Sequence, residues 1–180
     1  LSIIARDESN LEREQAQPLP LEHTLWANLP RHQTHWYALD LAEGQRASLE
    51  LLGLRISPTY IDARIMVYEP SGSLLLEADT SPLYYHDPAC SFRAETAGRH
   101  LVAIEETRNG QDHDDSRYGF GSDCFYVLHV GDFPQPQSLF PLGGRCGTDV
   151  AFTLSGDLDG PWSQTARLPK LPTFRKGPVG

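Results

Sequence analysis

The chain has 180 residues, of which 39% are hydrophobic and 22% are charged, a composition typical of a folded globular protein rather than a disordered one. Its formal net charge of −9 argues against binding to nucleic acid or to anionic membrane surfaces, both of which require basic residues. No apolar run approaches the roughly 18–20 residues needed to span a bilayer, and the length suits one domain, or one domain and part of a second.

The strongest helical signal lies in residues 1–17. Ser9 and Glu12 have the spacing of a capping box, and the Glu, Arg, Gln and Ala residues that follow favour a helix. Pro18 and Pro20 would end it, because proline cannot continue a helix. We therefore expect a short N-terminal helical segment of at most about two or three turns.

From Pro20 onward, hydrophobic and polar residues alternate over short stretches, which is the period of a β-strand. Turn residues separate these stretches, as in the segment that contains Pro70 and Gly72. The expected strands are residues 35–41, 47–54, 61–68, 74–78, 91–94, 100–105, 124–130 and 147–154. Because no amphipathic helices join them, the pattern predicts an all-β sandwich or barrel and argues against a parallel α/β fold.

We expect four segments along the chain. Residues 1–20 would pack on a β-sandwich formed by residues 21–133, and the two prolines within 132–136 mark its end. Residues 134–168 would begin a second β domain or add strands to the first, and residues 169–180 have the composition of a linker. The chain starts at Leu1 without an initiator Met or a signal peptide, so we expect both ends to be cuts in a longer protein.

Three cysteines, Cys90, Cys124 and Cys146, permit at most one internal disulfide. They lack the C-x-x-C spacing typical of zinc sites, and we expect small buried thiols. A bridge between Cys90 and Cys124 requires that their strands be neighbours.

Several motifs occur in a particular order over residues 5–133. The acidic segment 6–11 is followed by Ala16-Gln17 and Leu19-Pro20, and then by the aromatic stretch 32–39 and the turn Gly44-Gln45. Further motifs are residues 54–57, 61–62, 70–72, 97–102, 126–134 and 140–147. This order resembles the bacterial pre-peptidase C-terminal (PPC) domain, in the version found in exported proteins of Planctomycetes. The resemblance implies a jelly-roll-like antiparallel β-sandwich, related to the collagen-binding domains of clostridial collagenases.

The resemblance also implies a calcium site. In the collagenase branch of the family, an acidic N-terminal segment and two Asp residues of the next strand bind Ca²⁺, which prefers hard oxygen ligands. By position, Glu8 and Asn10 are retained here, and Asp7 and Glu12 lie beside them. Four positions depart from the family pattern, namely Arg6, Leu11, Gln33 and His35. Because they bring a positive charge and poor calcium ligands, we expect a degraded site, and the alternative is a capped helical turn with a solvated acidic face.

Two other patterns could suggest a metal. Asp112, Asp114 and Asp115 form an acidic loop, but the twelfth position of a calcium loop starting at Asp112 is Asp123 instead of the bidentate Glu. The loop is thus either a solvated hairpin tip or a weak metal or partner site. His32 and His35 form an H-x-x-H pattern, but side chains three apart on a strand face opposite sides, so no transition-metal site is expected.

Four tyrosines in predicted loops are candidates for a ligand-binding surface: Tyr60, Tyr84, Tyr85 and Tyr118. Tyrosine provides amphipathic contact area at a low entropic cost, which makes it a frequent anchor in binding surfaces. The alternative is that these side chains pack against an edge of the sandwich.

The sequence contains no nucleophile elbow, zinc-protease helix motif or phosphate-binding loop, and we expect Asp62 and Asp87 to cap turns. We therefore expect a non-catalytic accessory module of a larger secreted, periplasmic or cell-surface bacterial protein, such as a peptidase. It would contact other domains of its parent chain and bind a protein or polysaccharide polymer, or act as a folded spacer. The alternative is a carbohydrate-binding jelly roll or a structural part of a secreted hydrolase. No cofactor is expected other than the calcium that the resemblance implies.

Overall fold

The computed structural model describes residues 2–30, 33–56, 61–106 and 124–170 of the chain. The chain divides into two compact units, Leu1–Gln135 and Pro136–Gly180, which are described separately below. The division falls inside the stretch of residues 132–136 that carries the two prolines.

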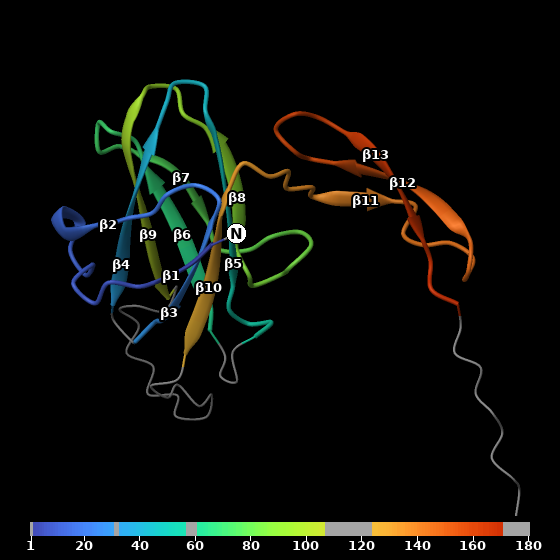
Figure 1. The fold of residues 1–180 in the computed structure, drawn as a ribbon, viewed down its shortest axis with the longest axis horizontal. Coiled ribbons are helices and arrows are strands. Elements are labelled where there is room, and N and C mark those ends of the chain that lie inside the picture. The colour runs from blue at the N-terminus through green and yellow to red at the C-terminus, as the bar shows by residue number, and fades with distance from the viewer. Residues whose placement is uncertain (1, 31–32, 57–60, 107–123, 171–180) are drawn as a thin grey trace, which may run out of the picture. The chain divides into compact units, whose positions relative to one another are not determined.

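The first unit consists of two five-stranded sheets that pack as a β-sandwich (Figure 1). The first sheet has the order β1-β3-β10-β5-β8, with the strands β1 (Ser2–Ala5), β3 (His23–Asn28), β10 (Phe125–Gly131), β5 (Arg46–Leu52) and β8 (Ala89–Arg93). The second has the order β2-β4-β9-β6-β7, with β2 (Gln17–Pro18), β4 (Thr34–Leu41), β9 (Gly98–Glu106), β6 (Ala63–Tyr68) and β7 (Leu74–Ala78). The all-β sandwich is confirmed.

Buried residues alternate with more exposed ones along the strands, and the buried rows form the core between the two sheets. On β6, Ala63, Ile65 and Val67 are buried while the residues between them are half-buried, and β10 alternates in the same way over most of its length. Because successive side chains of a strand point to opposite faces, each sheet directs one apolar row inward. The largest fully buried side chains include two tyrosines, Tyr37 and Tyr126, which bring hydroxyl groups into this core.

The N-terminal segment differs from its prediction. The expected short helical turn is present in its described part only as a 3₁₀ turn at Arg13–Gln15, so the two or three turns that the sequence would allow do not form. The expected capping box does not form, since the Ser9 hydroxyl donates to Asp7 Oδ1 and the residue before the turn, Glu12, makes no side-chain cap. Instead β1 and β2 each add a parallel strand to one sheet, β1 beside β3 and β2 beside β4, so sheet pairing has overridden local helix propensity.

The second unit contains a three-stranded antiparallel sheet of order β11-β12-β13, formed by β11 (Ser138–Phe140), β12 (Asp149–Ser155) and β13 (Trp162–Arg167). Phe152 is the only large side chain of its described residues that is buried. By the pairing register, Leu139, Leu154 and Trp162 share one face of the sheet with Phe152. A single three-stranded layer with so little buried apolar area obtains little stability from its own packing.

Cys90, Cys124 and Cys146 are not joined by disulfides. Cys90 lies on β8 and Cys124 directly precedes β10, and these strands are separated by β5 in the sheet. A Cys90–Cys124 disulfide therefore does not form. Cys124 is buried and Cys90 half-buried as expected, but Cys146 is exposed. Burial raises the pKa of the Cys90 thiol to about 12, which keeps it protonated and unreactive at neutral pH.

Among the described residues, no helix has the length and hydrophobicity required to cross a membrane.

Candidate functional site

The four residues expected to mark a calcium site differ in burial and in hydrogen bonding. Asp7 is exposed and its Oδ1 accepts hydrogen bonds from the Ser9 amide at 2.9 Å and the Ser9 hydroxyl at 2.8 Å. These bonds from Ser9 lower the pKa of the Asp7 carboxyl group. Glu8 and Glu12 are exposed, whereas Asn10 is fully buried. Within the described part of the chain, no group of three or more His, Cys, Asp and Glu side chains is placed to hold a metal ion.

Oxygen atoms of this segment already bind a cationic side chain. Arg6 Nε donates to Asn10 Oδ1 at 2.7 Å, and Arg6 Nη2 donates to the Glu8 carbonyl oxygen at a longer 3.4 Å. Because a guanidinium repels a second cation, this arrangement does not fit the calcium site that the family resemblance implies.

Buried polar groups also lie in the core between the two sheets. The Tyr37 hydroxyl hydrogen-bonds to the Tyr126 hydroxyl, and the Tyr126 hydroxyl to His35 Nδ1 at 3.0 Å. Tyr37 and His35 lie on β4 and Tyr126 on β10, so these bonds link the two sheets through the interior. Burial raises the pKa of both phenols, which therefore stay protonated.

His35 is fully buried within this network, and its Nε2 has no hydrogen-bond partner in the structure's described portion. Burial, with a smaller contribution from the charge of Arg6, lowers the pKa of His35 to about 3, so the ring is neutral at physiological pH. The sequence suggested His35 as a lost calcium ligand and as half of an H-x-x-H pattern, but not as a polar residue of the core. No local signal marks it, because its partner Tyr126 is 91 residues away.

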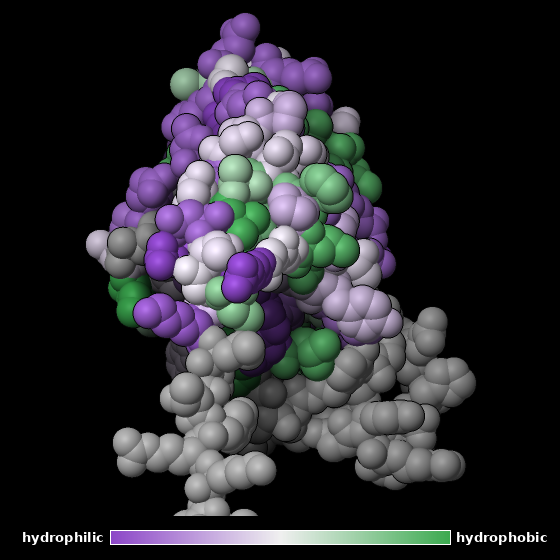
Figure 2. Space-filling view, turned by 90° about the vertical axis from the view of Figure 1, so that its right-hand side faces the viewer, coloured by the Kyte–Doolittle hydropathy of each residue, from purple (hydrophilic) through white to green (hydrophobic). Residues whose placement is uncertain are grey.

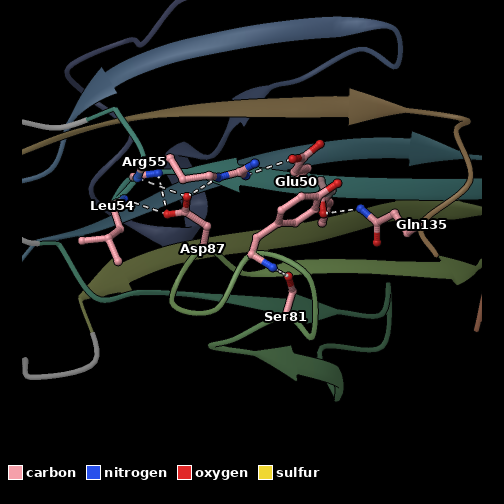
Figure 3. A network of polar contacts seen from close by, with 9 residues as sticks. Glu50, Leu54, Arg55, Ser81, Asp87 and Gln135 are labelled. Carbon is pink, nitrogen blue, oxygen red and sulfur yellow. Dashed lines mark hydrogen bonds and ion pairs between the residues drawn. The ribbon is translucent and has the colours of Figure 1, made fainter. Parts of the chain in front are cut away.

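A second polar network surrounds Asp87, whose side chain is completely buried. Asp87 Oδ1 accepts hydrogen bonds from the amides of Gly53 at 2.8 Å and Leu54 at 2.7 Å. Oδ2 accepts from Arg55, at 3.3 Å from its amide and 2.6 Å from Nε. Figure 3 shows the carboxylate beside Leu54 and Arg55, with the guanidinium extending toward Glu50, which it meets at 3.0 Å. A buried carboxylate is stable only with such partners, so Asp87 ties two loops together.

These two loops are residues 53–56, after β5, and residues 79–88, between β7 and β8; we call the second the 79–88 loop. Ser81 and Tyr85 exchange a pair of backbone hydrogen bonds of 2.8 and 2.9 Å, and the Tyr84 amide donates to Ser81 Oγ. The 79–88 loop is therefore closed by its own hydrogen bonds as well as anchored through Asp87.

The structure places two of the four candidate tyrosines in this loop. Tyr84 is half-buried, with the Arg55 guanidinium stacked 4.1 Å above its ring centroid. Tyr85 is 71% exposed and has a φ of 57°, in the left-handed region that non-glycine residues rarely adopt. Beside it, Leu83 is exposed, and His86 Nδ1 lies 3.3 Å from Asp62 Oδ1. The loop thus presents Leu83 and Tyr85 to solvent from a fixed backbone.

The remaining candidates lie outside the described residues. They are the tyrosines Tyr60 and Tyr118, the acidic cluster Asp112, Asp114 and Asp115, and His32 of the H-x-x-H pattern.

Exposed apolar side chains also occur away from the 79–88 loop. Trp26 on β3 is half exposed, and its ring centroid lies 6.2 Å from that of Phe125 on β10. On the face presented in Figure 2, hydrophobic residues form small separate areas among hydrophilic ones. Scattered exposed apolar residues are normal for proteins, so exposure alone does not distinguish a site. The buried anchor and the unusual backbone of Tyr85 do distinguish the 79–88 loop.

Comparisons with known proteins give only distant structural likenesses. No protein-family model matches the chain, and no curated protein matches it. The fold is similar to the pre-peptidase C-terminal domain of collagenase from Bacillus anthracis, with 16% identity, a TM-score of 0.47, and coverage of 64% of this chain and 93% of that one.

Two other solved structures are similar over the same 64% of this chain. The first is PliG from Aeromonas hydrophila, a periplasmic inhibitor of g-type lysozyme, with 15% identity, a TM-score of 0.45 and 96% coverage of that chain. The second is CorA from Methylomicrobium album BG8, a surface-associated copper-binding protein, with 10% identity, a TM-score of 0.43 and 98% coverage. Likenesses this distant assign no function to the chain.

The Asp87 anchor predicts a large loss of stability in an Asp87→Ala variant. Removing the carboxylate leaves buried amides and the Arg55 guanidinium without their acceptor, which should lower the free energy of unfolding by about 3–5 kcal/mol. Urea denaturation followed by circular dichroism would measure it. Asp7→Ala is the matched control, because Asp7 is exposed and also accepts backbone and side-chain bonds. Equal losses in the two variants would show that Asp87 is not an anchor.

The buried His35 predicts a pH-dependent stability. Its folded-state pKa of about 3 lies below the value of about 6.5 expected for unfolded chains, so the unfolded state binds the extra proton first. The contribution of the neutral His35 to the free energy of unfolding is therefore fully present above pH ~6.5. It is lost as the pH falls toward ~3, by at most about 1.4 kcal/mol per pH unit. Urea unfolding at several pH values should give a smaller decline for His35→Gln than for the wild type. Parallel pH profiles for the two proteins would contradict the assignment.

Proposed function

We propose that this chain is a non-catalytic binding module of a larger exported protein, and that the 79–88 loop binds a protein partner. The exported context and the accessory role rest on the order of motifs that resembles the PPC domain. The binding role rests on the 79–88 loop itself.

The observation that carries the proposal is the preorganised, exposed Tyr85. A left-handed backbone at a bulky residue costs about 1–3 kcal/mol and persists only where the surroundings enforce it. Here the enforcing contacts are the Ser81–Tyr85 backbone pair and the buried Asp87 carboxylate. Strain of this kind concentrates at functional sites, and a loop that is rigid before binding loses less entropy when a partner docks.

The side chains around Tyr85 favour a protein partner over a glycan. Leu83 is 44% exposed in the same loop, and Ile56 is 38% exposed in the segment that Asp87 joins to it. Aromatic residues are enriched among the residues that dominate the energy of protein interfaces, usually with apolar neighbours that exclude water. The alternative, a carbohydrate-binding module, would use the exposed Tyr85 ring to stack against a sugar.

Binding measurements with two defined probes test the proposal. Immobilised wild-type protein is exposed to triple-helical collagen, as a protein polymer, and to a panel of bacterial and plant glycans. We expect binding to collagen that falls at least about tenfold in Tyr85→Ala, equivalent to about 1.4 kcal/mol. Trp26→Ala is the matched control, because it removes an exposed aromatic side chain elsewhere on the sandwich.

Each of the other outcomes has a defined meaning. Binding to a glycan that depends on Tyr85 would favour the carbohydrate-binding alternative. Binding that is lost in Trp26→Ala and kept in Tyr85→Ala would move the surface to β3 and β10. Binding to neither probe would contradict a collagen-binding role and favour a folded spacer.

A further inference from the structure

The N-terminal segment crosses from one sheet of the sandwich to the other between β1 and β2. Asn10 docks this crossing on β4 with two hydrogen bonds to Trp36: the Trp36 amide donates to the Asn10 carbonyl oxygen at 2.8 Å, and Asn10 Nδ2 donates to the Trp36 carbonyl oxygen at 3.0 Å. The Gln17 side chain adds two more bonds, accepting from the Asp7 amide and donating to the Ala5 carbonyl oxygen. The crossing is therefore a defined structure, although its regular structure is limited to the 3₁₀ turn at Arg13–Gln15.

Arg6 supplies the positive charge of this crossing. Its guanidinium binds the Asn10 side-chain oxygen and, less closely, the Glu8 carbonyl oxygen, and its charge contributes to the lowered pKa of the neighbouring Asp7. A side-chain amide oxygen, a main-chain carbonyl oxygen and nearby carboxylates are the ligand types that Ca²⁺ takes from loops. Without Arg6, the buried Asn10 Oδ1 would lose its hydrogen-bond donor among the described residues, and the bonds of Asn10 to Trp36 would be weakened with it.

We propose that the Arg6 guanidinium is the resident cation of the crossing, in the role that Ca²⁺ has in the family which the sequence resembles. The segment then docks on β4 without a metal ion. The planar guanidinium suits this role because it directs two N–H groups to two separate oxygens and remains charged at all relevant pH values. The inference is independent of any binding by the 79–88 loop.

Arg13 provides a matched comparison within the same N-terminal segment. Its guanidinium lies over the rings of Tyr68, at 5.1 Å, and Trp36, at 5.9 Å, and donates to the Gly72 carbonyl oxygen. It therefore contributes packing and charge, but it does not join oxygens of the crossing. A charge change at Arg13 should leave the calcium response of the protein unaltered.

Thermal unfolding in EDTA and in millimolar CaCl₂ tests the proposal with four proteins: wild type, Arg6→Gln, Arg6→Glu and Arg13→Glu. We expect the wild type to have the same Tm in both conditions. Arg6→Glu should unfold several degrees lower in EDTA and regain most of that loss in CaCl₂, because a ligand that binds only the folded state raises the Tm. Arg13→Glu should show no calcium-dependent gain.

Hydrogen exchange of the Trp36 amide gives a second measurement that does not depend on calcium. In Arg6→Gln the crossing should open more often, and this amide should exchange at least about tenfold faster than in the wild type. The proposal is overturned if Ca²⁺ stabilises the wild type as much as Arg6→Glu, if Ca²⁺ does not stabilise Arg6→Glu, or if Trp36 exchanges equally slowly in Arg6→Gln and the wild type.

Discussion

A carboxylate buried at the end of β5 imposes the main constraint on the candidate site. Asp87 has no contact with solvent, and a charge removed from water is tolerated only when hydrogen-bond donors replace the water. The backbone of residues 53–55 supplies three of these donors and the Arg55 side chain a fourth. Packing against Ile61 requires a glycine beside this site, since a Cβ at Gly53 would lie 2.7 Å from Ile61 Cγ2. The hydrogen bonds to Asp87 thus hold two loops in place, and they thereby fix the position of Tyr85 in the second loop.

The sandwich contains a second buried polar system, and the two systems differ in purpose. Tyr37, Tyr126 and His35 hydrogen-bond to one another between the two sheets, and the bonds of Asn10 to Arg6 and to Trp36 join the N-terminal crossing to β4. Burial holds the two phenols and the imidazole in their uncharged forms, whereas the Arg6 side chain is only half-buried. The first set of bonds holds the two sheets and the N-terminal segment together, whereas the bonds of Asp87 fix the conformation of an exposed loop.

The sequence allowed the sandwich to be predicted, because two-residue alternation in stretches such as Ala63–Tyr68 directly reflects one buried sheet face. The N-terminal strands were missed because β1 and β2 are short edge strands, and a local capping pattern at Ser9 suggested a helix that sheet pairing overrides. The substitution of Arg6 in the calcium segment was visible in the sequence, but its bond to Asn10 was not. The anchoring of the loop by Asp87 could not be predicted from the sequence either, because its hydrogen-bond donors lie 32 to 34 residues away and leave no local pattern.

The central claim is that Asp87 holds a preformed loop surface in the free protein. Residue-resolved hydrogen exchange of the wild type tests this claim most directly, because the Gly53 and Leu54 amides donate to Asp87 and belong to no strand. The account predicts that these two amides exchange as slowly as the Leu51 amide of β5. Exchange as fast as that of the exposed turn residues 95–97 would contradict it, because the loop would then be open in solution and Tyr85 would not be preorganised.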